Sequence, residues 1–293
     1  MEELALGALA AVTASVLFSA GLVLQSLEAR KIPGEHSLRL SLIVRLLGRP
    51  RWIAGCLIMV VGFGFHVGAL LLAPLTVVQP SLAAGLVVLL VASARHDAER
   101  VRARDVLAVA AISLGVIGVT LTASQRNALS TNPAQLALAL SPLAAAAIAP
   151  YGLALRFSGH ERSGGVSATL GAGAAYALTG LTTKLVSDRL AAGDWVGAVL
   201  WLTITASAAG LALLDQTTAL QRRGATQVGV IIYVMPVVVP VLVAGVLLGE
   251  RWAASPAAAV LLALSMVAVC AGAASLSASH RAVTWEAASG SRK

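Results

Sequence analysis

Charged residues are scarce in this sequence. Asp, Glu, Lys and Arg together make up 12% of the 293 residues, against roughly 25% in an average soluble chain. Hydrophobic residues make up 58%, and a soluble domain of this length could not bury that much apolar surface. At about 20 residues per span, the chain has room for nine or ten membrane-spanning helices with short loops. The composition therefore predicts an all-α polytopic membrane protein with no separate water-soluble domain.

Cysteine is rare, and familiar enzyme motifs are absent from the sequence. Cys56 and Cys270 are the two cysteines, and both lie inside apolar runs, so no disulfide framework is indicated. The acidic start at Glu2 and Glu3 differs from the basic start of a cleavable signal peptide, so we expect the first apolar run to be a retained helix. There is no His-Glu-x-x-His, Cys-x-x-Cys, Gly-x-Ser-x-Gly or phosphate-binding loop. We therefore expect no catalysis, no cofactor and no ATP-driven step.

Nine apolar runs are long enough to cross a bilayer. They lie at about 3–27, 52–73, 76–94, 105–123, 133–155, 165–187, 196–221, 226–248 and 256–278. A further run at 36–48 is too short to span and is interrupted by Arg39 and Arg45. We predict that this run is an amphipathic helix on the inner membrane surface, with its arginines toward the lipid headgroups.

The basic residues fall almost entirely in alternate loops. Of the 21 lysines and arginines, all but Arg126, Arg189, Arg251 and Lys184 lie in the second and every later even-numbered non-membrane segment. The positive-inside rule places those segments in the cytoplasm. The pattern predicts a protein of the cell membrane with nine spans, its amino terminus outside and a cytoplasmic tail at 279–293. The net charge of +8 is explained by this pattern, so membrane lipids rather than nucleic acid are the expected partners.

Tryptophan stands at three of the predicted span ends. These residues are Trp52, Trp195 and Trp252. Amphipathic rings of this kind settle at the level of the headgroups. We therefore expect all three to be interfacial anchors.

The second to fourth spans resemble the seventh to ninth. The matching pieces are Arg51–Gly55 with Asp194–Ala198, Thr76–Val78 with Thr226–Val228, and Glu99-Arg100 with Glu250-Arg251. By the predicted topology the first copy starts inside and the second outside, so the copies are inverted, as in many secondary transporters. We predict one transmembrane domain over 1–293, with one repeat at about 1–125 and the other at about 132–278. Such a carrier would be passive or ion-coupled and would bind its substrate near the midplane between the repeats.

Few ionisable residues fall inside the predicted spans, where a charge is costly and needs a partner, a cavity or a function. Asp215 lies roughly 10 Å from the centre of its span toward the cytoplasm, where it could bind a cation or a proton. Alternatively, the span ends early and Asp215 is a solvated residue near Arg222. Lys184 lies roughly 13 Å from its span centre toward the outside, too far to pair with Asp215. We expect Lys184 to snorkel to the outer surface beside Asp188.

Other polar residues within the spans complete a candidate pathway. His66 lies in a glycine-rich stretch and is expected to be a hydrogen-bonded packing residue, with a proton relay as the alternative. Pro80, Pro236 and Pro240 are expected to kink their helices, and the carbonyls they free could line a site. The predicted pathway consists of Gln25, His66, Gln79, Tyr176, Lys184, Asp215, Gln216, Thr226 and Tyr233, with Asp215 as the one candidate metal ligand.

Several of these stretches resemble one transporter family. Arg49–Gly55, Ala69–Pro80, Thr183-Lys184, Ala219-Leu220 and Thr226–Tyr233 are similar to the NIPA-like branch of the drug/metabolite transporter superfamily, a resemblance that extends over about residues 5–278. The resemblance implies a nine-span relative of the ten-span EamA-type fold, lacking one early helix. Eukaryotic members of the branch are regarded as magnesium transporters. Where the family shows Val-Thr-Pro in both repeats, this chain has Val78-Gln79-Pro80 and Val228-Gly229-Val230.

The sequence thus predicts a secondary transporter that works by alternating access. Its substrate is either Mg²⁺ or another divalent cation, or a small organic metabolite or drug. Mg²⁺ prefers oxygen ligands, and Asp215 is the one carboxylate that we expect to be buried. A membrane scaffold or accessory subunit without transport of its own is the remaining alternative. The small-residue helix faces fit internal packing and a homodimer equally well.

Overall fold

The computed structural model describes residues 2–72, 81, 85–91, 102–122, 133–156, 161–247 and 255–290, and every regular element within them is a helix. The long helices are α1 (Glu2–Ala29), α3 (Pro50–Leu72), α5 (Ala103–Thr122), α6 (Pro133–Arg156), α7 (Glu161–Ala191), α8 (Trp195–Arg222), α9 (Ala225–Leu247) and α10 (Pro256–Gly290). Residues 85–91 are also helical, and η1 (Gly34–His36) and α2 (Leu40–Leu47) are short. The predicted all-α fold is confirmed for these residues.

Five of the described helices are long and apolar enough to cross a membrane. These stretches are Ala5–Ala29, Pro50–Ala69, Leu136–Ala154, Trp195–Arg222 and Pro256–Ser275. Their outward faces carry large apolar side chains such as Leu57, Val60 and Leu264, each more than half exposed. A soluble monomer rarely exposes so much contiguous apolar surface. The helices therefore support the predicted membrane protein.

Local sequence sets several helix ends. Proline is the first residue of α3, α6 and α10, a position where its missing N–H costs no hydrogen bond and its fixed φ suits the helix. Gly193, with φ of +73°, makes the left-handed turn that ends α7, since a residue with a Cβ is strained there. Asp194 then caps α8 by accepting a hydrogen bond of 2.9 Å from the amide of Gly197. α10 continues through the predicted tail to Gly290.

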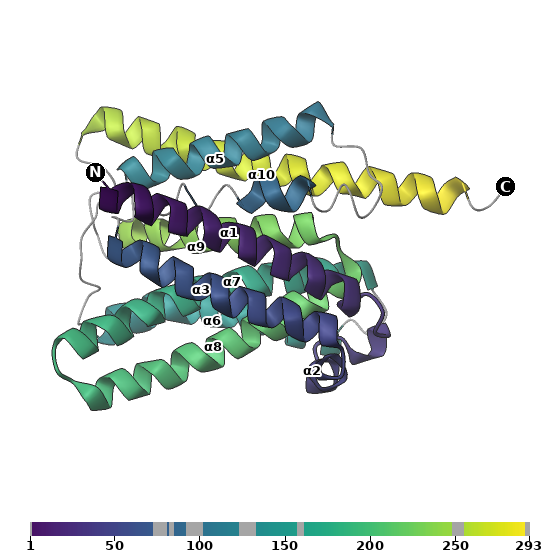
Figure 1. Cartoon of the computed structure of the whole chain (residues 1–293), viewed down its shortest axis with the longest axis horizontal. Coiled ribbons are helices and arrows are strands. Elements are labelled where there is room, and N and C mark those ends of the chain that lie inside the picture. Colours follow the sequence, from purple (N-terminus) through teal and green to yellow (C-terminus); the bar gives the residue numbers. More distant parts are fainter. Residues whose placement is uncertain are drawn as a thin grey trace.

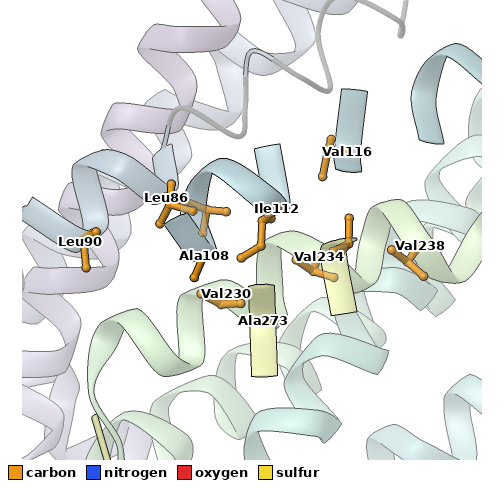
Figure 2. Close-up of a cluster of buried hydrophobic side chains, with 11 residues drawn as sticks. Leu86, Leu90, Ala108, Ile112, Val116, Val230, Val234, Val238 and Ala273 are labelled. Carbon is orange, nitrogen blue, oxygen red and sulfur yellow. The ribbon is translucent and has the colours of Figure 1, made fainter. Parts of the chain in front are cut away.

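α9 lies between two groups of helices (Figure 1). On one side α5 and α10 pack against each other, and on the other α6, α7 and α8 pack together. Figure 2 shows the cluster that joins α9 to α5, α10 and the segment 85–91. Its labelled members are Leu86, Leu90, Ala108, Ile112, Val116, Val230, Val234, Val238 and Ala273. A second cluster joins the other face of α9 to α1, α7 and α8.

Neighbouring helices approach closely where glycine removes a side chain. α1 and α3 run antiparallel, because Gly21 meets Met59 and Gly55 whereas Leu17 and Phe18, earlier on α1, meet Gly62. α5 and α10 are also antiparallel. Gly115 and Gly118 of α5 lie against Ser265 and Val269 of α10, and Gly272 lies against Ala108 and Ile112. Small residues of this kind let helix backbones approach in membranes.

The segment predicted as a surface helix is shorter than expected and covers Trp52. α2 has the two faces of an amphipathic helix: Leu42 and Leu46 are buried, whereas the other face exposes Leu40 and Val44. The buried face packs with Trp52, which is only 2% exposed. Trp52 is therefore no interfacial anchor, and that prediction was wrong because hydropathy could not foresee the cover from α2.

The other two tryptophans differ from Trp52. Trp195 is 70% exposed at the start of α8, a position that fits the predicted anchor. Trp252 lies outside the described residues. The first turns of α3 and α8, which match in sequence, are therefore placed in different surroundings.

Candidate functional site

α8 brings polar side chains into the middle of the protein. Its first half is largely exposed, with Val196, Val199 and Leu202 pointing outward. Its second half is enclosed by α1, α2, α6, α7 and α9, and every residue from Leu214 to Leu220 is buried. Buried polar groups must find hydrogen bonds or pay a desolvation cost. The partners of this stretch therefore define the candidate site.

A chain of hydrogen bonds crosses the protein from α7 to α3. The hydroxyl of Tyr176 on α7 donates to Oε1 of Gln216 on α8 at 2.7 Å. Nε2 of Gln216 donates to Oε1 of Gln25 on α1 at 2.5 Å. Nε2 of Gln25 in turn lies 3.3 Å from both Cys56 Sγ and Met59 Sδ on α3. Three of the predicted pathway residues, Gln25, Tyr176 and Gln216, are thus joined in one network, which we call the polar chain.

A second polar contact lies between α1 and α9. The hydroxyl of Ser19 donates to the backbone oxygen of Gly85 at 2.7 Å, and it lies 3.1 Å from the hydroxyl of Tyr233. A Cβ at Gly85 would come within 3.0 Å of Ser19, so the glycine lets the segment 85–91 approach α1. Tyr233, another predicted pathway residue, is therefore held against α1. Thr226, in the first turn of α9, is buried, and its Oγ1 has no hydrogen-bond partner among the described residues.

Asp215 occupies a separate position beside the polar chain. Its side chain is 0% exposed, and neither carboxylate oxygen has a hydrogen-bond partner in the described structure. The carboxylate lies over Gly171 of α7, where a Cβ would stand 2.7 Å from Oδ2 and 2.6 Å from Cγ of Pro150. Tyr151 of α6 faces the carboxylate, but the two groups do not reach hydrogen-bonding geometry.

This placement settles one alternative left by the sequence. α8 continues for two more turns to Arg222, so the helix does not end at Asp215. The side chain is also fully buried, so the interpretation of Asp215 as a solvated residue is wrong. The side chain is buried because residues of α6 and α7 cover the carboxylate.

The connection between α1 and α2 is bound to the end of α8. The hydroxyl of Thr218 accepts a hydrogen bond of 3.0 Å from the amide of Leu38, which has a left-handed φ of 57°. Gln221 donates to the carbonyl of Ile32 at 3.2 Å and accepts from the hydroxyl of Ser37 at 3.0 Å. These bonds tie the α1–α2 connection across the end of the bundle at which both α1 and α8 end. We call this the closed end.

His66 lies away from these groups. It packs on α3 between the rings of Phe18 and Phe63, with centroid distances of 6.4 and 6.5 Å. Its Nδ1 has no hydrogen-bond partner in the described part of the chain. His66 thus packs against two aromatic rings, and of the hydrogen bonds expected for it, none is formed at Nδ1 with a described residue.

For two predicted pathway residues the structure describes no side chain. Gln79 falls outside the described residues, and so does the side chain of Lys184, although α7 itself continues past it. The nearby hydroxyls of Thr179, Thr182 and Thr183 bond to carbonyls one turn earlier in their own helix. The hydroxyls of Thr179 and Thr182 are therefore satisfied within α7.

Four residues of the site were missed by sequence reasoning: Ser19, Cys56, Met59 and Tyr151. Tyr151 could have been predicted from the sequence, because a tyrosine inside an apolar run needs a partner for its hydroxyl when buried. Cys56 and Met59 gave no such signal, since sulfur side chains are ordinary packing residues in apolar helices.

The chemistry of the site is that of neutral polar side chains with one carboxylate. Amides and hydroxyls can exchange hydrogen bonds with a solute, and the carboxylate can bind a cation or a proton. Among the described residues, no group of three or more His, Cys, Asp or Glu side chains is placed to hold a metal ion. Comparison of the chain with known protein families, curated proteins and solved structures found no match.

Proposed function

We propose that this chain is a secondary transporter of the drug/metabolite superfamily, NIPA-like in type, that works by alternating access. The observation that carries the proposal is the polar chain. It links Gln25 and the sulfur atoms of α3, which belong to the first proposed repeat, to Tyr176 and Gln216, which belong to the second. Substrate sites of inverted-repeat transporters lie at such an interface.

The depth of the polar chain agrees with this role. Tyr176 is the middle residue of α7, and Gln216 and Gln25 lie toward the ends of α8 and α1. The chain therefore extends from the middle of the bundle toward its closed end. Polar groups inside a membrane are costly, and those that face the interior of a helix bundle often line substrate pathways.

Helix directions support the inverted repeat. α5 and α10, which end the two proposed copies, run antiparallel. α3 and α8, which begin them, also run in opposite directions. α3 is antiparallel to α1. α8 runs parallel to α1, because Gln216 bonds to Gln25 and, further along both segments, Gln221 bonds to Ile32. Corresponding helices of inverted copies must cross the membrane in opposite directions. The proposal therefore includes the inverted repeat and nine membrane spans. It also places the protein in the cell membrane, with its amino terminus outside and its carboxyl terminus in the cytoplasm.

The cargo is either a divalent cation or a small organic solute. Mg²⁺ is bound in proteins through one or two carboxylates while keeping several waters. Asp215 supplies one carboxylate, but it is fully buried beside a phenol, a glycine and a proline, and no accessible surface remains for such waters. The amides and hydroxyls of the polar chain suit an organic solute better. A small polar organic molecule is therefore the cargo that the geometry favours, and Mg²⁺ is the second candidate.

Flux in reconstituted vesicles tests the proposal. Purified protein would be placed in liposomes that contain a Mg²⁺-sensitive dye, and parallel vesicles would be screened for uptake of radiolabelled organic solutes. The Gln216→Leu variant breaks the polar chain, and Thr203→Val, whose hydroxyl bonds only within its own exposed turn, is the matched control. We expect saturable flux that Gln216→Leu reduces at least tenfold and Thr203→Val leaves unchanged.

Two results would decide against parts of this account. Mg²⁺ flux that needs Gln216, without movement of any organic solute, would replace the favoured cargo with the second. Vesicles that contain folded, inserted protein and move neither class of solute would contradict transport. A scaffold would then be the better explanation, particularly if the protein co-purifies with a fixed partner.

A further inference from the structure

Among the buried acids of the described residues, Asp215 is the one whose carboxyl oxygens make no hydrogen bond. Glu28 pairs with Lys31, and Asp105 accepts a bond from the amide of Arg102, so both of those buried carboxylates are accounted for. Neither oxygen of Asp215 has a donor, and no cationic side chain of the described residues pairs with it. A carboxylate in this position needs either a ligand or a proton.

We propose that Asp215 is the proton-binding site of this protein. The inference rests on the proposed transport function and adds the coupling ion to it. A proton forms an O–H bond with one carboxyl oxygen and removes the charge, so the group can stay buried without a counterion. It enters from water when the bundle opens and returns to water on the side to which the bundle next opens.

The groups around Asp215 favour a proton over a metal ion. α6 presents Tyr151 and Pro150 to the carboxylate, and α7 presents Gly171, which carries no side chain. Gln25, Tyr176 and Tyr233 from the other packed helices are engaged in hydrogen bonds of their own. On α2 the one cation, Arg45, is exposed, and Arg222 of α8 bonds to Ser37 two turns beyond Asp215.

Burial of this kind couples protonation to conformation. The enclosed state has no water and no donor at the carboxylate, so it favours the neutral acid, whereas an open state would hydrate the ionised form. Any group whose proton affinity differs between two states shifts the balance between them. Binding of a proton therefore favours closure, and opening to an alkaline compartment releases it.

Infrared spectroscopy of the full chain in lipid tests the site without any cargo. A protonated carboxyl group has a carbonyl stretching band that disappears when the group ionises. We expect such a band in the wild-type protein near neutral pH, its loss at alkaline pH, and its absence in Asp215→Asn. Asp105→Asn, which removes a buried carboxylate that has a partner, is the matched control and should keep the band.

The outcomes separate this inference from the transport proposal. Asp215→Glu keeps a carboxyl group at this position and should retain a band that titrates, at a new frequency. This variant shows that loss of the band in Asp215→Asn comes from loss of the carboxyl group and not from misfolding. A wild-type spectrum in which no band depends on Asp215 at any pH would overturn the proton site, even if flux is found. If the band is present, an imposed pH gradient should change flux in wild-type vesicles and not in Asp215→Asn. Flux that ignores the gradient in both would overturn coupling.

Discussion

The contact between α5 and α10 gives a quantitative test of the helix packing. A methyl group at Gly115 would stand 2.6 Å from the backbone oxygen of Ser265 and 2.6 Å from Cγ2 of Val269. Ordinary contact begins at 3.4 Å, so Gly115→Ala requires the two helices to separate by about 0.8 Å. The oxygen belongs to the backbone of α10 and cannot rotate away, so the whole helix must move.

The magnitude follows from two opposing effects. Overpacking of this kind costs about 1–3 kcal/mol, while alanine gains about 1 kcal/mol over glycine in a helix. Gly180→Ala on α7 is the matched control, because nothing lies within 4 Å of its added methyl group. We expect Gly115→Ala to be less stable than Gly180→Ala by about 1–3 kcal/mol, as measured by reversible unfolding in mixed micelles. Equal stability of the two variants would refute the close packing of α5 and α10.

Three further predictions concern other parts of the molecule. Gln216→Leu leaves two buried hydrogen-bonding groups without a partner and should cost about 1–3 kcal/mol in the same unfolding assay; a variant as stable as wild type would argue against the polar chain. The capping amide, and then the salt bridge with Arg189, hold the pKa of Asp194 below its ordinary value. Its ionised form therefore stabilises the fold above that ordinary value, and this stabilisation is lost as the pH falls through the lowered pKa. The melting temperature of Asp194→Asn should thus lie below that of wild type at neutral pH and converge with it in strong acid; a constant difference would contradict this. Leu42→Ala opens a cavity under α2 and should cost about 2–5 kcal/mol, whereas Val44→Ala on the exposed face should cost far less, and similar losses would show that the two faces were misassigned.

The positions of the helices followed from the sequence because each depends on local composition. The run predicted at 133–155 is α6 (Pro133–Arg156), and its start is marked by a proline that suits the first turn of a helix. α10 continues to Gly290, beyond its predicted span, because hydropathy detects where an apolar run ends and not where a helix ends. Alanine-rich sequence can stay helical after it leaves a membrane.

The partners of the site residues could not be predicted in the same way. Gln25 and Gln216 are separated by 191 residues, and their contact depends on how α1 and α8 cross. Hydropathy identified both as polar residues in apolar runs but could not pair them. The cover of α2 over Trp52 and the approach of Tyr151 to Asp215 also depend on helix packing, which one sequence does not specify.

Accessibility of buried cysteines from each side of the membrane tests alternating access most directly and needs no cargo. Ser19→Cys and Thr226→Cys would be made with Cys56 and Cys270 replaced by serine, since both positions are buried between the proposed repeats. Val199→Cys, 62% exposed on the apolar face of α8, is the control. We predict that a membrane-impermeant thiol reagent modifies both buried positions from either side and leaves the control unmodified. Modification from neither side, in protein that is folded and inserted, would contradict the account.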